Sequence, residues 1–215
     1  MATAVVLPVK SFAQAKQRLS NRFDAPERAV LAAAMVEDVL DELTRAALGP
    51  LVVVSAEPRA LSLAEDASAL IVVDERELGQ SAAALLGLAR AGELGCERAL
   101  LVPGDCPLMD ADELRDLAGR AGSTDVVIVP DRHGTGTNAL ALAPSGPFEP
   151  QFGVGSCVRH VEQAVAKGLE HEVLRVPSLA LDVDTREDAS ALETALARFP
   201  ERAPRTREAL TRAAA

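Results

Sequence analysis

Three aspartates occupy positions from which their carboxylates could share a metal ion. Asp105 follows the apolar run 99–102 in the segment PGD, and Asp182 and Asp184 are two residues apart in LDVD. On an extended strand, residues i and i+2 face the same side, where two like charges repel each other unless a cation lies between them. Oxygen ligands without a His or Cys cluster favour Mg²⁺ over zinc, so the three carboxylates predict a magnesium site. The alternative for Asp105, and for one member of the pair, is a turn residue that binds its own backbone.

Positively charged side chains cluster directly after the first apolar run, residues 4–9. Lys10 follows residues 4–9, and Lys16 and Arg18 come next in LPVKSFAQAKQRLS, so two of the chain's three lysines lie here. A lysine point charge and an arginine fork both suit a phosphate chain, whereas the alternative is a solvated, charged helix face. The segment lacks the glycine-rich GxxxxGK[ST] pattern, so a P-loop ATPase is not expected.

The segment PDRHGTGTN, residues 130–138, is unusually rich in small hydrogen-bond donors. Gly134 and Gly136 permit positive φ and would leave backbone N–H groups free to point at an anion. Thr137 and Asn138 add side-chain donors at its end. An anionic substrate group is the expected ligand, and a tight turn is the alternative.

A second glycine pair follows in FGVGS, residues 152–156, directly before a helical pattern. Gly153 and Gly155 flank Val154, and Ser156 is the expected N-cap of the helix, with Arg159 and His160 near its first turn. Free N–H groups and the helix dipole at that end favour a phosphate or carboxylate. A tight turn is again the alternative.

Apolar and amphipathic runs alternate along the chain and define the elements that must position these side chains. Apolar runs predict strands at residues 4–9, 51–55, 70–73, 99–102, 125–129 and 138–142, and short strands near 173–176 and 179–183. Helices are expected at 26–47, 58–67, 79–93, 110–121, 156–167 and 186–197. Repeated β-α-β units predict one α/β domain over residues 1–199, with a mostly parallel sheet and helices on both faces. Ligands of such sheets bind beyond the carboxyl ends of the strands, where the residues described above lie.

Helix-capping residues mark several of these boundaries. Asp24 is the expected N-cap of the first helix, Asp110 begins the helix at 110–121, and Thr185 with Asp188 forms a capping box for the helix at 186–197. The charged, Ala-rich tail at 200–215 is expected to be either a loosely attached helix or disordered.

Composition limits the possible partners and the compartment. The chain has 215 residues, 48% hydrophobic content and a net charge of −10, which argues against a nucleic-acid partner. Three cysteines without a CxxC pattern, and the lack of a signal-peptide core or a membrane-spanning run, predict a cytoplasmic protein that does not enter a membrane. A monomer and a homodimer both stay open.

Four segments together resemble a known family. They are LPVKSFAQAKQRL, VPGDCPLM, PDRHGTGTNAL with FGVGSCVRH, and LDVDTRED, spread over roughly residues 4–190. They resemble the phospholactate/phosphoenolpyruvate guanylyltransferases (CofC/FbiD-type) of coenzyme F-420 biosynthesis. The resemblance implies a single GT-A-like, Rossmann-type fold. It also implies an enzyme that joins the GMP part of GTP to the phosphate of a small phosphorylated acid and releases pyrophosphate.

Carried over position by position, the resemblance implies a role for each candidate residue. Asp105, Asp182 and Asp184 would bind Mg²⁺. Lys10, Lys16 and Arg18 would lie along the triphosphate and act in catalysis with Asp105. The rest of the nucleotide would contact Pro8, Gly79, Ser81, Pro103 and Gly104, where LGQS at 78–81 replaces the GLN-type turn common in such enzymes. The acid would contact Thr137, Gly153 and Ser156, with Asn138, Gly155 and Arg159 beside them.

The implied reaction needs no general base. An acceptor phosphate is already an anionic nucleophile at neutral pH, so catalysis depends on in-line placement and charge neutralisation, and neither His133 nor His160 is needed as a base. Phosphoenolpyruvate is the preferred acid, and 2-phospho-L-lactate is the other family substrate. The alternatives are a nucleotidyltransferase of the same fold acting on 3-phospho-D-glycerate, molybdopterin or a sugar phosphate, and a non-catalytic GTP-binding protein.

Overall fold

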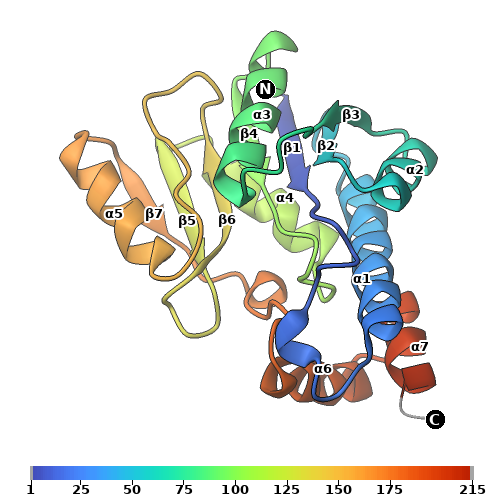
Figure 1. The fold of residues 1–215 in the computed structure, drawn as a ribbon. Helices are drawn as coiled ribbons and strands as arrows, with labels where there is room; N and C mark the ends of the chain where they lie inside the picture. Colours follow the sequence, from blue (N-terminus) through green and yellow to red (C-terminus); the bar gives the residue numbers. More distant parts are fainter. Residues whose placement is uncertain (1, 214–215) are drawn as a thin grey trace.

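A computed structural model, which describes residues 2–213, contains one seven-stranded sheet (Figure 1). The strand order is β3-β2-β1-β4-β6-β5-β7, and every neighbouring pair is parallel except those that involve β6. The strands are β1 (Thr3–Pro8), β2 (Leu51–Ser55), β3 (Leu70–Val73), β4 (Arg98–Leu101), β5 (Val126–Pro130), β6 (Thr137–Leu142) and β7 (His171–Val173). The predicted α/β class with a mostly parallel sheet is confirmed.

The strand order reverses between β1 and β4. From β1 the chain passes outward through β2 and β3, then returns to the other side of β1 with β4. At such a reversal the loops that leave the two strands diverge, which opens a crevice at the carboxyl ends of the strands. The loops after β1 and β4 carry Lys10, Lys16 and Asp105, so the fold places these residues at the crevice.

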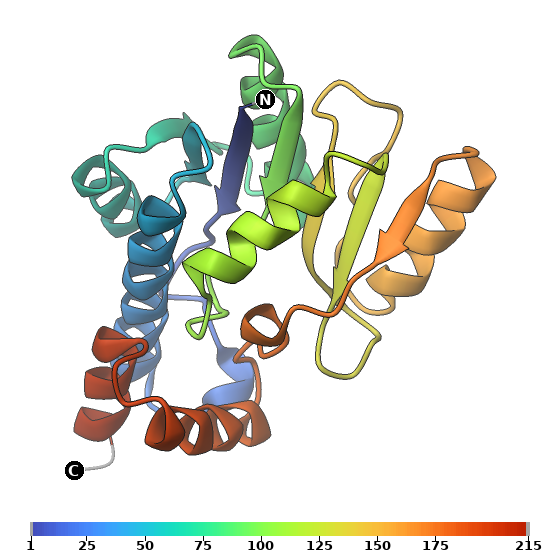
Figure 2. The same ribbon diagram turned by 180° about the vertical axis from the view of Figure 1, so that it is seen from behind.

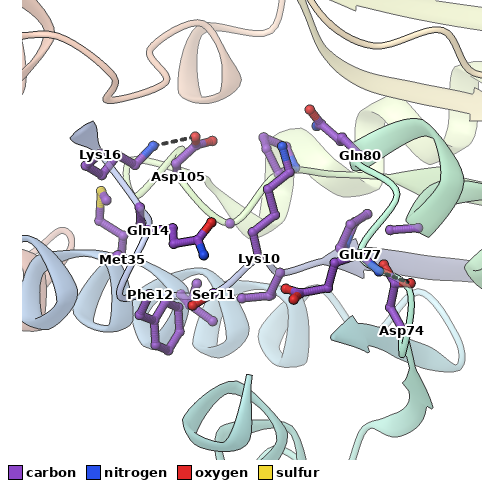
Figure 3. Close-up of a pocket in the computed structure, with 18 of the residues that line it drawn as sticks. Lys10, Ser11, Phe12, Gln14, Lys16, Met35, Asp74, Glu77, Gln80 and Asp105 are labelled. Atoms are coloured by element: carbon purple, nitrogen blue, oxygen red, sulfur yellow. Dashed lines mark hydrogen bonds and ion pairs between the residues drawn. The ribbon is translucent and has the colours of Figure 1, made fainter. Parts of the chain in front are cut away.

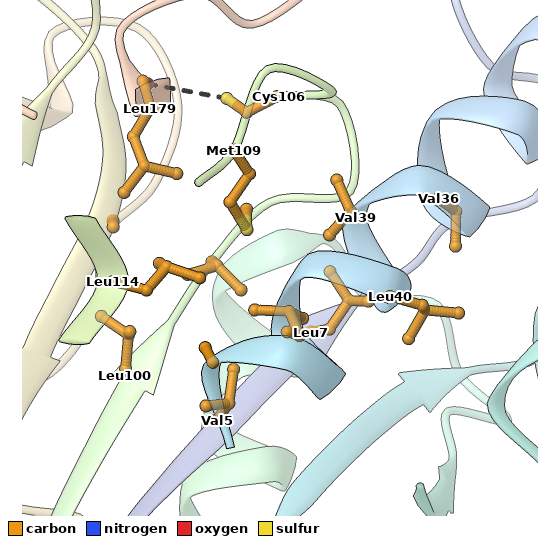
Figure 4. Close-up of a cluster of buried hydrophobic side chains, with 14 of the residues drawn as sticks. Val5, Leu7, Val36, Val39, Leu40, Leu100, Cys106, Met109, Leu114 and Leu179 are labelled. Atoms are coloured by element: carbon orange, nitrogen blue, oxygen red, sulfur yellow. Dashed lines mark hydrogen bonds between the residues drawn. The ribbon is translucent and has the colours of Figure 1, made fainter. Parts of the chain in front are cut away.

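Helices cover both faces of the sheet. One face packs against α1 (Ala25–Ala46), α2 (Pro58–Asp66) and α4 (Ala111–Arg120), and the other face packs against α3 (Gln80–Glu93) and α5 (Ser156–Ala166). Figures 1 and 2 show the two layers from opposite sides. Between the sheet and α1, side chains such as Leu7, Val39 and Leu100 are buried together (Figure 4). The apolar, β-branched strands therefore form a core on each face, which holds the strand ends in place.

The predicted capping residues act as expected at three helices. Asp24 and Glu27 form a capping box at α1, and Asp110 accepts hydrogen bonds from two first-turn amides of α4. Thr185 and Asp188 form the capping box of α6 (Arg186–Arg198). At α5 the prediction is wrong, because the N-cap is Gly155, in a left-handed conformation, and Ser156 is the first helical residue.

The segment before α6 is not the predicted strand at 179–183. It contains a 3-10 helix, η2 (Pro177–Leu179), and then an irregular stretch up to the cap of α6. The amide of Val183 donates to the carbonyl of Asp105 at 3.1 Å, and Asn138 Nδ2 donates to the Leu179 carbonyl at 2.7 Å. Contacts with the β4 loop and with β6 thus replace strand pairing, and they bring this segment against the β4 loop.

A third apolar cluster joins the two ends of the chain. Leu19 of the 3-10 helix η1 (Gln17–Leu19) packs with residues of α1, α6 and α7 (Pro204–Ala213). Asp38 of α1 is buried and accepts hydrogen bonds from Thr206 N at 2.8 Å and Thr206 Oγ1 at 2.7 Å. Most of the C-terminal tail is thus a closely packed helix, and its last residues, 214–215, lie outside the described part. No helix among residues 2–213 has the length and apolarity needed to cross a membrane.

Candidate active site

A cavity of about 500 Å³ opens at the carboxyl ends of β1 and β4 (Figure 3). Loops after four strands form its wall, as expected for a crevice at the reversal of strand order. Of the residues predicted to bind nucleotide or metal, those that line it are Pro8, Lys10, Lys16, Gly79, Pro103, Gly104, Asp105 and Asp184. The backbone packs closely here, since a Cβ added at Gly104 would lie 2.9 Å from Val36 Cγ2.

The Lys16 ammonium bridges two of the predicted metal-binding carboxylates. Its Nζ lies 2.6 Å from Asp105 Oδ2 and 2.9 Å from Asp184 Oδ1, although these residues are 89 and 168 positions away in sequence. Lys16 has a left-handed backbone, with φ of 55°, at the N-cap of η1. The left-handed region is rarely adopted by residues other than glycine, so the surrounding packing must hold this turn.

Charges around this bridge shift the pKa values of its members. Burial by itself would lower the pKa of Lys16, but the attraction of Asp105 and Asp184 outweighs it and raises the pKa above its ordinary value. Burial would raise the pKa of Asp184, yet Lys16, Arg18 and Lys10 together lower it. Lys16 is therefore charged and Asp184 ionised at neutral pH, and Lys10 and Arg18 add positive charge nearby.

Asp182 stands apart from this bridge. Its carboxylate accepts from Asn138 Nδ2 at 3.3 Å, and its pKa is raised by burial and by the charge of Asp105. The expected strand alignment of Asp182 and Asp184 is absent, since the segment is irregular and Lys16 reaches only Asp184. Among residues 2–213, no group of three His, Cys, Asp or Glu side chains is arranged to hold a metal ion.

Two carboxylates nevertheless converge on one cationic position. Asp105 Oδ2 and Asp184 Oδ1 both contact the same ammonium nitrogen, so they would also face a small cation placed between them. Mg²⁺ in nucleotide sites commonly takes one or two protein carboxylates and completes its octahedron with phosphate oxygens and water. The donor set therefore fits Mg²⁺ with Asp105 and Asp184 as ligands, provided that Lys16 gives up this position.

Two predicted nucleotide contacts do not line the cavity. Arg18 is exposed on η1, although its charge is close enough to lower the pKa of Asp184. Ser81 Oγ accepts a hydrogen bond from Phe152 N at 2.9 Å, which ties the start of α3 to the FGVGS segment. Ser81 thus connects the cavity wall to the second glycine-rich loop.

Several donors of residues 131–136 are occupied by a carboxylate of the same loop, contrary to the prediction. Asp131 accepts from the amides of His133, Thr135 and Gly136 at 3.1, 2.9 and 2.8 Å, and from Thr135 Oγ1 at 3.2 Å. These hydrogen bonds outweigh the effect of burial and lower the pKa of Asp131. The glycine-rich loop does surround an anion, but that anion is its own aspartate.

The start of α5 is also less open than predicted. Gly153 and Gly155 have φ values of 114° and 72°, yet Ser156 N donates to the Gly153 carbonyl and Cys157 N donates to the Thr135 carbonyl. The Arg159 guanidinium folds back onto the carbonyls of Val154 and Gln151. Two of the N–H groups expected to face a ligand are therefore already bonded within the protein.

Thr137 and Ser156 also carry side-chain hydroxyls at this place. Thr137 Oγ1 lies 2.9 Å from His160 Nδ1. Both Thr137 and Ser156 are buried. Thr137 is the first residue of β6 and Ser156 is the first residue of α5. A hydrogen bond from Cys157 N to the Thr135 carbonyl joins the two segments near these residues. Neither Thr137 nor Ser156 lines the cavity of about 500 Å³, so their contact with the acid stays a prediction.

Sequence reasoning missed several residues that the structure brings into the site. Asp74, Glu77 and Gln80 line the end of the cavity beyond Lys10 (Figure 3). Asp74 Oδ1 accepts from Glu77 N at 3.1 Å, which closes the turn after β3. The signal available in the sequence was the position of Asp74 directly after the predicted strand at 70–73.

Comparisons with known proteins show the family of this chain. Residues 3–194 match the family described as Guanylyl transferase CofC like. The chain is 44% identical to the phosphoenolpyruvate guanylyltransferase of Conexibacter woesei, over 92% of this chain and 90% of that protein. It is 38% identical to the 3-phospho-D-glycerate guanylyltransferase of Phenylobacterium zucineum, over 86% of each. In fold it resembles a nucleotidyl transferase structure from Methanothermobacter thermautotroptrophicus, with a TM-score of 0.65, 20% identity, and coverage of 93% and 99% of the two chains.

The family match covers all four segments that carry the resemblance, from the lysine-containing loop after β1 to the aspartates before α6. The two relatives are each more than 30% identical over most of the chain. The chain belongs to the CofC-like guanylyl transferase family.

Proposed function

We propose that this protein transfers GMP from GTP to the phosphate of phosphoenolpyruvate and releases pyrophosphate, as a step in coenzyme F-420 biosynthesis. The observation that carries the proposal is the cluster of Lys16, Asp105 and Asp184 in a cavity at the reversal of strand order. A paired cation and carboxylate site is what phosphoryl-type transfer requires, because its catalysis is mostly positioning and charge neutralisation. The 44% identity to a phosphoenolpyruvate guanylyltransferase supports the choice of acid.

The cavity volume of about 500 Å³ is in the range of small-molecule binding sites, and charged and polar side chains line it. Lys10 and Lys16 line the part that would hold the triphosphate, and Asp74, Glu77 and Gln80 line the part beyond Lys10. Guanine presents N–H donors at N1 and its 2-amino group, which carboxylates accept and which adenine does not present in the same way. We therefore assign the base to the end lined by Asp74 and Glu77.

Asp105 and Asp184 would hold Mg²⁺, with phosphate oxygens of the nucleotide as further ligands. The ion would neutralise charge on the phosphates and orient them for displacement. Lys16, which now pairs with both carboxylates, would donate to the phosphate chain in the loaded enzyme. Lys10, which also lines the cavity, would add a second positive charge along the same chain.

The acceptor acid would bind at the hydroxyls of Thr137 and Ser156. A phosphate or carboxylate oxygen can accept from both hydroxyls, which need no change of protonation state. The acid's phosphate is anionic at neutral pH, so it can attack the α-phosphate without a general base. Asn138 donates hydrogen bonds to the Leu179 carbonyl and to Asp182, so it would hold the segment before α6 in place and would not contact the acid.

The identity of the acid is open to direct measurement. Phosphoenolpyruvate, 2-phospho-L-lactate and 3-phospho-D-glycerate share a carboxylate and a phosphate, and the relative from Phenylobacterium zucineum is a 3-phospho-D-glycerate guanylyltransferase. Incubating the protein with GTP, Mg²⁺ and each acid in turn, with mass detection of the guanylylated product, should give most product with phosphoenolpyruvate. ATP in place of GTP is the control for base selectivity.

Two outcomes would contradict the proposal. Product formed only with another acid would replace the assigned substrate while leaving the guanylyl transfer in place. GTP binding without pyrophosphate release, with every acid, would instead indicate a non-catalytic GTP-binding protein.

A further inference from the structure

His160 is a fully buried histidine whose two ring nitrogens both have defined partners. It lies in the first turns of α5, and its ring centroid is 5.6 Å from those of Phe148 and Phe152. Its Nδ1 is 2.9 Å from Thr137 Oγ1, and its Nε2 is 2.8 Å from the backbone nitrogen of Gln151. The imidazole therefore joins Gln151, the residue before the FGVGS segment, to the start of β6.

The partner of Nε2 determines where the ring proton lies. A backbone N–H is a donor only, so Nε2 must accept from Gln151 and carry no proton. The proton of the neutral ring is then on Nδ1, which donates to Thr137 Oγ1. A second ring proton, on Nε2, would face the Gln151 N–H, and the hydrogen bond from Gln151 N to Nε2 would be lost.

The proton on His160 Nδ1 also determines the role of the Thr137 hydroxyl in this hydrogen bond. A hydroxyl has one proton and two acceptor lone pairs, and one lone pair of Thr137 is used by the His160 proton. Since the only hydrogen bond of this hydroxyl within residues 2–213 is the one from His160, its own proton is available to donate elsewhere. A hydroxyl in this state is a donor toward an anion.

We propose that His160 is a positioning residue, which holds the Thr137 hydroxyl so that its proton points at an anionic oxygen of the acid substrate. This inference rests on the proposed function, because it concerns the acid subsite of the same reaction. Burial, with a smaller effect of the Arg159 charge, lowers the pKa of His160 to about 4, so the ring stays neutral at physiological pH. Because both nitrogens are occupied, His160 does not act as a general base.

The proton position can be measured on the unmodified protein. Protein labelled with ¹⁵N at histidine should give ring nitrogen shifts of a neutral Nδ1–H tautomer for His160 at neutral pH, in the absence of substrates. A Nε2–H tautomer, or a charged ring at neutral pH, would overturn the inference whatever the enzymatic activity.

Two substitutions separate the two hydrogen bonds. His160→Asn keeps a side-chain donor near the position of Nδ1 but lacks the acceptor for Gln151, whereas His160→Gln keeps an acceptor near the position of Nε2 and loses the donor to Thr137. We expect His160→Gln to raise the KM for the acid by about 10-fold, as for a weakened hydrogen bond to a charged group, and to leave the KM for GTP within about 2-fold. His160→Asn should raise the KM for the acid by less than about 3-fold.

A purely structural role predicts something different. If His160 only packs the loop, the KM for the acid should follow the loss of thermal stability in both variants, without regard to which hydrogen bond is kept. That result would overturn the inference.

A double-mutant cycle tests whether His160 acts through Thr137. Thr137→Val removes the hydroxyl at nearly constant volume, and adding His160→Gln to it should then raise the KM for the acid by less than about 2-fold further. Additive effects would show that His160 acts by another route. If no acid is guanylylated at all, the proposed function fails, and the tautomer measurement alone still decides the state of His160.

Discussion

At the scale of single residues, the site is organised around the Lys16 ammonium. It is held by Asp105 and Asp184, which come from the β4 loop and from the segment before α6. Removing either carboxylate would leave a buried ammonium with one partner. In the proposed reaction it would also leave Mg²⁺ with one protein ligand fewer, and both effects would act on the transition state because they change the charge next to the phosphates.

Asp105→Asn and Asp184→Asn should each abolish Mg²⁺-dependent pyrophosphate release from GTP plus acid. The amide is nearly isosteric, so the loss would come from charge and not from shape, and a decrease of at least about 100-fold in kcat/KM is expected. Asp112→Asn is the matched control, since its side chain is 86% exposed on α4. Turnover near that of the wild type in both site variants would remove the metal-site proposal.

Lys16→Met should separate the two roles of the lysine. Without the ammonium, Asp105 and Asp184 face each other with no cation between them, so the free protein should bind Mn²⁺ more tightly. Turnover should nevertheless fall by about 100-fold, because the phosphate chain loses a charged donor. Electron paramagnetic resonance measures the free Mn²⁺ without any nucleotide, and unchanged Mn²⁺ affinity would show that Lys16 does not compete for the cation position.

At the scale of elements, close packing of helices on the sheet positions the loops of the site. Helix α3 meets β1 at Gly87, where an added Cβ would lie 2.2 Å from Val6 Cγ1. Its N-terminal end carries Gly79 and Gln80 into the cavity wall. Any shift of α3 away from β1 would therefore move one side of the site.

Gly87→Ala should lower the free energy of unfolding by about 1–3 kcal/mol, because the extra methyl group forces α3 away from the sheet. Gly119→Ala is a matched control, since nothing lies within 4 Å of an added Cβ on that residue of α4. The control should be neutral or stabilising by up to about 1 kcal/mol, from the higher helix propensity of alanine. Urea unfolding measures both changes, and equal losses in the two variants would contradict the packing argument.

At the scale of the whole molecule, His160 links stability to pH. Its pKa is lowered from 6.5 to about 4 in the folded state, by burial first and the Arg159 charge second. The unfolded chain therefore takes up a proton below pH 6.5 that the folded protein does not bind until about pH 4. The contribution of His160 to the free energy of unfolding should be fully present above pH 6.5, and it should be lost as the pH decreases from 6.5 to about 4.

Because of His160, the free energy of unfolding should decrease by at most about 3 kcal/mol between pH 6.5 and 4, as the size of the pKa shift implies. His160→Gln removes the titrating group, so its free energy of unfolding should change less with pH over this interval than that of the wild type. Parallel curves for the two proteins, measured by urea unfolding at several pH values, would show that the histidine is not the cause. Asp184 and Asp131, whose pKa values are lowered, should contribute only at lower pH, where they take up protons.

Much of the fold and part of the site follow from local sequence patterns. Apolar runs identify the strands β1 to β6, and Asp24, Asp110 and Thr185 mark helix starts, because strand burial and capping depend on residues close together in the chain. The position of Lys10 and Asp105 after strands places them at one edge of the sheet. The Asp131 loop also had a local signal, since an aspartate before a Gly-rich stretch commonly binds its own backbone.

Other features depend on contacts between residues far apart, which no local pattern specifies. The pairing of Lys16 with Asp105 and Asp184 needs the β1 loop, the β4 loop and the segment before α6 to meet, and that follows from the strand order. The bonds of His160 to Thr137 and Gln151 likewise need the first turns of α5 beside the start of β6 and the loop before α5. The sequence determines which charges and donors are available and roughly where each strand ends. Only tertiary packing decides which of them neutralise one another and which stay free for a ligand, because that depends on distances of a few ångströms across separate elements.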